Sequence, residues 1–329
     1  MMDLVFCGTP EFAVPILQRL VTAEFHVRLV VTQPDRARGR RLEVTPSPVK
    51  QAALDLGLPV FQPDKIKNND EFRAELQSIA PQAIIIVGYG KIIPQWMIDL
   101  PPFGNLNVHA SLLPKYRGAA PIQWAIAKGE TVTGVTIMRI DAGLDTGDIL
   151  MQAEEPIKQE DTALTLAPRL AHLGAEQMLL TLAGLAKGTI QPEKQDDSLA
   201  TLAPILKRED GVIDFERTAT EAWNRLRGFQ PWPGAFTTFR GKMLQLHDAA
   251  PAPEIAVVKS EHFAVEQGRL LLGFAHGTAL EIRELQVEGK KRMSVADFIN
   301  GYRPESDEVL GAPRPVLSSP KDSRPSSGR

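Results

Sequence analysis

The chain has 329 residues, of which 43% are hydrophobic and 23% are charged, and its formal net charge is −3 at pH 7. A chain of this length exceeds the size at which a single hydrophobic core keeps growing, so it predicts two domains. Because the charge is balanced, the chain as a whole is not basic enough to attract nucleic acid, and a nucleic-acid-binding site would have to come from a local cluster of basic residues. The single cysteine, Cys7, excludes an internal disulfide framework and a cysteine-rich metal site.

The N-terminal residues show no targeting segment. Residues 1–12 contain no basic stretch followed by a long apolar run, and nowhere do about 18 apolar residues follow one another. Cys7 lies inside an apolar run, which favours a small buried side chain over a nucleophile. We therefore expect a cytoplasmic protein with no contact to a membrane.

Strand and helix patterns alternate through the first part of the chain. Short apolar runs and runs with helical spacing predict, in order, strand 3–7, helix 11–23, strand 26–32, helix 47–57, strand 82–90 and strand 104–110. Ser47 is placed to cap the second helix. Continuous apolar strands separated by helices predict an α/β domain with a Rossmann-like, mostly parallel sheet and helices on both of its faces.

A ligand is expected at the carboxyl ends of these strands, because open parallel sheets bind ligands beyond that edge. Three segments follow strands directly and should converge there, namely Gly8, Gly88–Gly90 and Asn107–Ser111. The phosphate-cradling turn of a dinucleotide site requires three glycines, and the first strand is followed by one. We therefore do not expect a nicotinamide cofactor.

Two further strands and a long helix complete the first domain, residues 1–188. The strands, 133–141 and 147–157, are joined by the turn AGLDTG. Residues 162–188 predict an amphipathic helix with a kink or a break near Pro168. Residues 189–206 mix turn formers with scattered apolar residues and predict a linker.

Residues 207–303 predict a second, smaller domain. Short alternating runs at 234–249, 254–260, 263–274 and 278–289 indicate a small β-barrel or β-sandwich. Residues 304–329 are rich in proline, serine and charge, and we expect a disordered tail there.

The stretch NVHASLLP, residues 107–114, carries the clearest signal for chemistry. Asn107 and His109 are two residues apart on a predicted strand, so their side chains share one face. A strand end whose polar residues meet solvent would explain the same pattern. Asp145, in the turn between the next two strands, is the acidic residue best placed to fix the tautomer and charge of a histidine, although aspartate is also a common turn former.

Two basic clusters could bind phosphate groups. The first lies within residues 33–50, on the crevice side, and contains Arg36, Arg38, Arg40, Arg41 and Lys50. A solvated charged loop and a flexible arm that contacts phosphates both account for it. The second cluster lies in the C-terminal domain and consists of Lys290, Lys291 and Arg292. For this second cluster a solvated surface is the simpler interpretation.

Several motifs together are similar to those of a known family. They are FCGTPEFAVPIL, TQPDR, SPVK, VGYGKIIP, NVHASLLPKYRGAAPIQWAI, TGVTIMRIDAGLDTGDI, GFQPWPGAF and GKKRMSVADFINGYR. On these motifs the chain resembles the folate-dependent formyltransferases, from residue 3 to about residue 303. The basic loop and the C-terminal domain make it similar to the branch of that family that acts on methionyl-tRNA.

The resemblance implies an activity and its catalytic residues. The activity is formyl transfer from 10-formyltetrahydrofolate, as co-substrate, to the α-amine of methionyl initiator tRNA. The implied catalytic residues are Asn107, His109 and Asp145.

The resemblance also implies binding residues. It implies that folate contacts Ser111, Leu112, Leu113 and Pro114. We expect the other side of the pterin pocket to be formed, through main-chain groups, by Gly88, Tyr89 and Gly90. The implied tRNA contacts are the basic loop, with Arg40 and Arg41, and a C-terminal OB-like domain.

The chemistry of formyl transfer suits these residue types. The amine attacks the formyl carbon, an oxyanion forms, and the folate nitrogen leaves protonated. This acyl transfer requires an oxyanion donor, such as an asparagine amide, and a group that moves protons, such as a histidine beside a carboxylate. It requires no metal and no covalent nucleophile, so we expect no metal, and we infer no obligate protein partner.

Two other functions stay open at this point. A related formyltransferase acting on a small amine, such as an amino sugar nucleotide, would keep the same catalytic residues but would have no use for the arginine loop. A nucleic-acid-binding protein that has kept an inactive enzyme fold would have no use for the catalytic residues.

Overall fold

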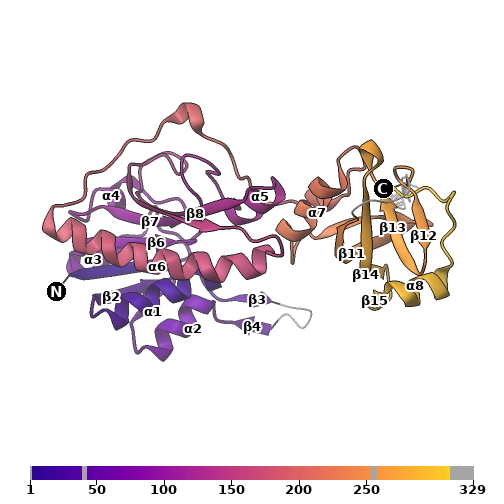
Figure 1. Ribbon diagram of the computed structural model, residues 1–329. Helices are drawn as coiled ribbons and strands as arrows, with labels where there is room; N and C mark the ends of the chain where they lie inside the picture. Colours follow the sequence, from indigo (N-terminus) through magenta and orange to yellow (C-terminus); the bar gives the residue numbers. More distant parts are fainter. Residues whose placement is uncertain (1, 39–42, 253–257, 312–329) are drawn as a thin grey trace, which may run out of the picture. The chain divides into compact units, whose positions relative to one another are not determined.

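The computed structural model describes residues 2–38, 43–252 and 258–311, and the chain divides into two compact units after Leu206. In unit 1, residues 1–206, strands and helices alternate (Figure 1). Its strands are β1 (Asp3–Gly8), β2 (His26–Val31), β3 (Arg36–Arg38), β4 (Glu43–Thr45), β5 (Val60–Phe61), β6 (Ala83–Val87), β7 (Asn105–His109), β8 (Val132–Arg139) and β9 (Ile149–Pro156). Its helices are α1 (Val14–Thr22), α2 (Pro48–Asp55), α3 (Asp70–Ile79), α4 (Gln95–Ile98), α5 (Pro121–Ala127) and α6 (Ala163–Lys187), with short 3-10 turns at Glu11–Ala13 and Asp197–Leu199.

The main sheet of unit 1 has the strand order β5-β2-β1-β6-β7-β8-β9. The first five strands in this order are parallel, whereas β8 and β9 are antiparallel to their neighbours. The register pairs Gly8 with Val87 and Ile86 with Asn107, so β1, β6 and β7 end at the same edge. The predicted mostly parallel sheet is therefore confirmed, and the segments that follow these three strands leave it at one edge.

Helices cover both faces of this sheet, because its inner strands carry apolar residues on both sides. On one face Leu4 and Phe6 of β1 pack in a core with α1, α2, α5 and α6. On the other face Val5 and Cys7 pack in a core with α3 and α4. Cys7 is fully buried, as expected, and burial raises the pKa of its thiol.

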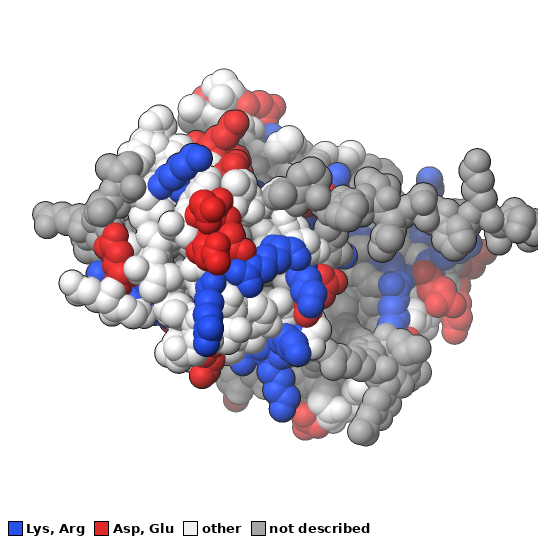
Figure 2. Space-filling model, turned by 90° about the vertical axis from the view of Figure 1, so that its right-hand side faces the viewer, with Lys and Arg blue, Asp and Glu red and all other residues white. Residues whose placement is uncertain are grey.

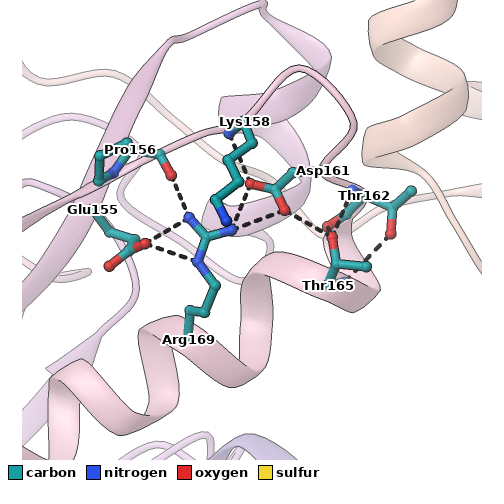
Figure 3. Close-up of polar contacts among 7 residues, drawn as sticks. All are labelled: Glu155, Pro156, Lys158, Asp161, Thr162, Thr165 and Arg169. Atoms are coloured by element: carbon teal, nitrogen blue, oxygen red, sulfur yellow. Dashed lines mark hydrogen bonds and ion pairs between the residues drawn. The ribbon is translucent and has the colours of Figure 1, made fainter.

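A polar network fixes the start of α6, the helix that closes unit 1 (Figure 3). Thr162 caps the helix: its hydroxyl accepts a hydrogen bond from the Thr165 N–H, and the Thr165 hydroxyl accepts one from the Thr162 N–H. The Arg169 guanidinium lies 2.5 Å from the Glu155 carboxylate and 2.7 Å from the Asp161 carboxylate. These bonds tie the first turns of α6 to the end of β9.

The helix α6 continues through Pro168, so the expected break is absent. Pro168 lacks the N–H that would bond to the carbonyl of Leu164, four residues earlier. Leu164 is exposed, so water can take that bond. The packing of the helix on the sheet outweighs the loss of one hydrogen bond.

The Asp161 carboxylate should make the stability of unit 1 depend on pH. Burial alone would raise the pKa of Asp161, but hydrogen bonds from Arg169, the Lys158 N–H and Thr165 hold it below the usual 3.8. The carboxylate therefore stabilises the folded state fully above that value, and the contribution is lost as the pH falls through the folded-state pKa. We expect Asp161→Asn to lower the free energy of unfolding by about 2 kcal/mol near neutral pH.

Denaturant titrations of the wild type and Asp161→Asn would test this. The difference between the two should shrink as the pH falls below the usual pKa of 3.8. A difference that stays constant at these lower pH values would show that folding does not lower the pKa of Asp161.

Unit 2 comprises residues 207–329, and its described residues, 207–252 and 258–311, form an antiparallel sheet with two helices. Its strand order is β10-β11-β14-β13-β12, and β15 pairs with β14. Its elements are α7 (Ala219–Gly228), β10 (Ala235–Phe239), β11 (Lys242–Pro251), β12 (Phe263–Glu266), β13 (Arg269–Gly273), β14 (Ala279–Val287), β15 (Met293–Ser294) and α8 (Val295–Tyr302), with 3-10 turns at Arg208–Gly211 and Ala275–Gly277.

The sheet of unit 2 curls so that its first and last strands approach each other. The ring of Phe239 in β10 lies 5.8 Å from that of Phe263 in β12. Both rings pack on Phe298 of α8, at 5.4 and 6.0 Å. This curled antiparallel sheet is consistent with the expected OB-like β-barrel.

The structure differs from the sequence-based expectation, or does not describe the residues, in three segments: the expected linker, the expected tail and one expected strand. Residues 189–206, expected as a linker, pack on unit 1, where the Ile149 N–H donates to the Glu193 carbonyl and Ala203 is fully buried. Of the expected tail, residues 304–311 are described, and Leu310 is buried among the core residues of unit 2; residues 312–329 lie outside the described residues. The strand expected at 254–260 also lies largely outside them, and residues 258–260 are not in a strand.

Basic and acidic side chains are interspersed on the face shown in Figure 2, as the small net charge of the sequence leads one to expect. Within residues 2–38, 43–252 and 258–311, no helix combines the length and the apolar character needed to cross a membrane.

Candidate active site at the carboxyl edge of the sheet

The strand β7 brings Asn107 and His109 to one face at the carboxyl edge of the sheet. It lies between β6 and β8, with Asn107 opposite Ile86 and Met138. His109 is buried, and Asn107 is half-buried. The side chain of Asn107 forms no hydrogen bond with any described residue, so its amide is available to a ligand.

The His109 ring is held in one orientation. Its Nε2 lies 2.9 Å from the carbonyl oxygen of Tyr116. A carbonyl can only accept, so Nε2 carries the proton, and in the neutral ring Nδ1 is the basic nitrogen. Nδ1 lies 3.7 Å from Oδ2 of Asp145. The tautomer is thus fixed by a backbone carbonyl and not, as the sequence suggested, by the carboxylate.

Asp145 reaches the histidine because the turn between β8 and β9 is strained and anchored. Its own φ is +52°, in the left-handed region. Its Oδ2 accepts a hydrogen bond of 2.8 Å from the Gly118 N–H. Gly118 has a φ of +122°, and a Cβ there would lie 2.7 Å from the Ala203 carbonyl, so only glycine fits. The Asp145 carboxylate therefore lies beside His109, and residues predicted from two separate segments are brought together.

Two residues that the sequence analysis missed hold the Asp145 turn in place. The Gln195 side-chain amide donates to the carbonyls of Asp145 and Gly147, at 2.9 and 2.7 Å. Its oxygen accepts two hydrogen bonds from the buried Arg117 guanidinium, at 3.0 and 2.7 Å. Gln195 belongs to the segment expected as a linker, which has no periodic pattern that could have marked it.

Replacing Gln195 by alanine should release this turn. We expect turnover to fall about tenfold, because Asp145 would no longer be held opposite His109. The affinity for folate should stay within about twofold of the wild type, since Gln195 does not touch the segments expected to bind it. Steady-state kinetics and a folate titration would check this, and an unchanged turnover would remove Gln195 from the positioning of Asp145.

The segment Ser111–Pro114 is fixed by hydrogen bonds to the neighbouring strands. Thr136 of β8 accepts from the Leu113 N–H at 3.1 Å, and its hydroxyl donates to the Ser111 carbonyl at 2.7 Å. Gln152 of β9 donates to the Leu113 carbonyl at 2.8 Å. The Leu113–Pro114 peptide is cis. This segment follows β7 directly, so a rigid backbone adjoins the histidine.

The segment Gly88–Gly90 follows β6 and offers backbone, not side chains. Gly88 and Gly90 are exposed and have positive φ, whereas the Tyr89 side chain is 1% exposed and packs in the core beneath the sheet. Tyr89 can therefore contribute only main-chain groups to a ligand. A cavity of about 510 Å³ opens beside Gly88, between the ends of β1 and β2.

The predicted phosphate-binding residues have different environments. Arg36 is exposed, the backbone of Arg38 lies in β3, and Arg40 and Arg41 lie outside the described residues. Lys50 is bonded to Asp35 at 2.5 Å. In unit 2, Lys290, Lys291 and Arg292 are exposed, and Arg292 forms an ion pair with Glu284. Among the described residues there is no group of three or more His, Cys, Asp or Glu side chains that could hold a metal ion.

Two family models match the chain. One, described as formyl transferase, matches residues 2–182, and the other, described as formyl transferase, C-terminal domain, matches residues 205–303. The chain belongs to the formyl transferase family.

Within that family its relatives are methionyl-tRNA formyltransferases. The enzyme of that name from Koribacter versatilis is 65% identical, over 94% of this chain and 99% of its own length. The enzyme from Acidobacterium capsulatum is 60% identical, over 94% of this chain and 100% of its own length. The chain is thus placed among the methionyl-tRNA formyltransferases, which confirms the resemblance found in the sequence.

Solved structures share the fold at low identity. An N-formyltransferase from Helicobacter canadensis, solved with folinic acid and dTDP-3-aminofucose, has a TM-score of 0.64 at 19% identity and covers 86% of this chain and 99% of its own. HypX from Aquifex aeolicus, solved with tetrahydrofolic acid, has a TM-score of 0.60 at 20% identity and covers 92% of this chain and 48% of its own. At these identities the likeness establishes the fold alone.

Proposed function

We propose that unit 1 transfers the formyl group of 10-formyltetrahydrofolate to the α-amine of methionyl initiator tRNA, and that Asn107, His109 and Asp145 carry out this step. By its family the chain is a methionyl-tRNA formyltransferase, an enzyme that prepares initiator tRNA for translation. The folate co-substrate is supported by the two neighbours solved with folates. The cytoplasm, where initiator tRNA is charged and used, is the proposed location.

The fixed orientation of the His109 ring is the observation that carries this proposal. Because Nε2 donates to the Tyr116 carbonyl, Nδ1 is the nitrogen that can accept a proton, and it faces Asp145 across 3.7 Å. A carboxylate at that distance stabilises the imidazolium that forms when Nδ1 takes a proton. His109 is therefore arranged to take a proton from one reactant and return it to another.

The reaction can be written with these groups. The lone pair of the methionyl amine forms a bond to the formyl carbon, and the carbonyl electrons move onto the formyl oxygen. His109 Nδ1 accepts a proton from the attacking nitrogen and delivers it to the folate nitrogen as the bond between that nitrogen and the formyl carbon breaks. The products are the formamide and tetrahydrofolate, so one proton moves from amine to folate and no group stays on the enzyme.

Asn107 is proposed to stabilise the oxyanion. Its side-chain amide is half-buried, forms no hydrogen bond with a described residue, and shares a face of β7 with His109. An amide donor placed before the reaction starts costs no reorganisation when the negative charge develops.

The pterin ring is proposed to lie between the segments Gly88–Gly90 and Ser111–Pro114. Both follow adjacent parallel strands at the carboxyl edge, and both are held in place by hydrogen bonds to neighbouring segments. Alternating donors and acceptors on the pterin edge suit main-chain groups. A structure with a folate analogue should show density beside both segments, and density elsewhere would contradict this placement. Because the Tyr89 ring is buried, its hydroxyl should not touch the ligand.

The proposed acceptor, initiator tRNA, is supported by the basic hairpin formed by β3 and β4. The hairpin follows β2 at the carboxyl edge, and Arg36 on β3 is exposed. We assign the phosphate contacts to Arg36, Arg38, Arg40 and Arg41, and additional contacts in unit 2 to Lys290, Lys291 and Arg292.

A formylation assay with three acceptors would test the proposal. The full chain is given 10-formyltetrahydrofolate with methionyl initiator tRNA, with uncharged tRNA plus a methionine ester, or with an amino sugar nucleotide. We expect efficient transfer only to methionyl-tRNA. Transfer to the amino sugar nucleotide alone would support the small-amine alternative, and transfer to none would mean that the fold is no longer catalytic.

A further inference from the structure

Asp35 is the centre of a cluster of polar side chains at the root of the basic hairpin. Its Oδ2 accepts a hydrogen bond from Lys50 Nζ at 2.5 Å, and its Oδ1 accepts one from Gln62 Nε2 at 2.8 Å. The side chains of Asp35 and Lys50 are only 26% and 22% exposed. The Lys50 bond first, and then the Gln62 bond, hold the pKa of Asp35 below its usual value. Both carboxylate oxygens are therefore used within the protein.

The same cluster continues toward the segment expected to bind folate. Gln62 Nε2 also donates to the Gln33 carbonyl at 2.9 Å, and Gln33 Nε2 donates to the Tyr89 carbonyl at 2.8 Å. A continuous series of hydrogen bonds thus joins Lys50, at the start of α2, to Tyr89, between the two exposed glycines. We call the side chains of Gln33, Asp35, Lys50 and Gln62 the root clamp.

The returning arm of the hairpin is held at the same place. The hydroxyls of Thr32 and Ser47 are 2.8 Å apart and buried, so the residues just before and just after the hairpin are bonded to each other. Ser47 also caps α2 by accepting from the Lys50 N–H at 3.0 Å. A hairpin of two three-residue strands has little stability of its own. Its direction is therefore set at its root.

We propose that the root clamp positions the basic hairpin relative to the folate-binding segment, and that Asp35 and Lys50 are positioning residues for tRNA and not phosphate ligands. This rests on the proposed function, in which the hairpin binds tRNA. The charge of Lys50 is balanced by Asp35 at 2.5 Å, so it has little attraction left for a phosphate. The clamp fixes the distance between the phosphate contacts and the reacting amine.

The two roles for Lys50 predict effects of opposite sign. If Lys50 is a phosphate ligand restrained by Asp35, then Asp35→Asn frees its charge and tRNA binds more tightly. If the clamp positions the hairpin, Asp35→Asn breaks a charge-assisted bond, and we expect the Kd for methionyl-tRNA to rise about tenfold. We expect a similar rise for Lys50→Met, and no further rise for the double variant, because both changes break the same contact.

Salt dependence separates positioning from phosphate contact. The slope of log Kd against log salt concentration counts the phosphates that are neutralised. It should be the same in the wild type, Asp35→Asn and Lys50→Met, whereas Arg36→Ala, at an exposed position of β3, should flatten it. Lys50→Arg should recover most of the affinity, because it can still bond to Asp35. Lys187→Met, at the end of α6 far from the hairpin, is the matched control for loss of one lysine (Figure 1).

The experiment uses the full chain and measures tRNA binding, formylation, folate affinity and melting temperature for each variant. A flatter salt slope for Lys50→Met, or tighter binding for Asp35→Asn, would overturn the proposal. If Asp35→Asn and Lys50→Met lower the melting temperature equally but leave the Kd for tRNA unchanged, the clamp only stabilises the fold. That result would also overturn the proposal. If the wild-type protein binds tRNA but does not formylate it, the proposed function is refuted. The binding data would still test whether the root clamp positions the hairpin.

Discussion

His109→Ala is expected to lower turnover by about 100- to 10,000-fold, the range that general acid–base catalysis contributes. Nδ1 of His109 is the only ring nitrogen free to move a proton, because Nε2 is bonded to the Tyr116 carbonyl. Asn107→Ala should cost about 100- to 1000-fold, as expected for the loss of one oxyanion donor. Both changes remove groups that act in the transition state, so the KM for tRNA should change little.

Asp145 acts through the histidine, and its replacement should show a different pattern. Asp145→Asn keeps the size of the side chain but removes the negative charge 3.7 Å from Nδ1. We expect turnover to fall at least about 100-fold, because the imidazolium is no longer stabilised. Folate binding and tRNA binding should persist in all three variants, with folate bound more weakly at most.

Single-turnover formylation of methionyl-tRNA, with a melting curve for each variant, would measure these effects. His172→Ala, a histidine exposed on α6, is a matched control that should keep wild-type turnover. Near-normal turnover in His109→Ala would refute the assignment of the acyl-transfer step to this site.

The shared face of Asn107 and His109 could be predicted because it depends on a local rule, the two-residue period of a strand. The apposition of Asp145 and His109 depends on more than the order of the strands. Because β8 is antiparallel to β7, its carboxyl end is opposite the start of β7. The bond from the Gly118 N–H to Asp145 holds the carboxylate beside His109. The sequence pointed to Asp145 only by its residue type and by its place in the next turn.

The supports of this site could not be predicted, because they join distant residues without a pattern. The bond from Arg117 to Gln195 spans 78 residues, and Gln195 lies in a stretch without periodicity. The Tyr116 group that fixes the histidine is a backbone carbonyl, which every residue has. The single glycine of RGAAP was a visible signal, since Gly118 is the residue whose N–H bonds to Asp145.

The number of charges in the basic loop did not show which of them are paired within the protein. Lys50 was grouped with the arginines, but in the folded chain its charge is balanced by Asp35. The residue type was informative and the direction of the side chain was not, because that direction is decided by packing between elements far apart in sequence.

Replacing Arg40 and Arg41 together by alanine is expected to raise the apparent KM for methionyl-tRNA by about 100-fold at moderate salt. Phosphate contacts supply a large, sequence-independent part of nucleic-acid affinity, and each contact displaces bound counterions. Folate binding does not depend on these phosphate contacts, so the affinity for folate should be unchanged. Turnover at saturating tRNA should fall only if the hairpin also positions the acceptor end of the tRNA at the active site.

The salt dependence decides between a binding arm and a solvated loop. In the double variant, the slope of log KM against log salt concentration should fall by about one unit for each lost phosphate contact. Lys187→Ala, which removes a lysine at the opposite end of unit 1, should leave the slope as in the wild type (Figure 1). Parallel curves for the wild type and the double variant would mean that Arg40 and Arg41 only face solvent. The phosphate contacts would then have to come from the exposed Lys290 and Lys291 of unit 2, and their replacement should flatten the slope instead.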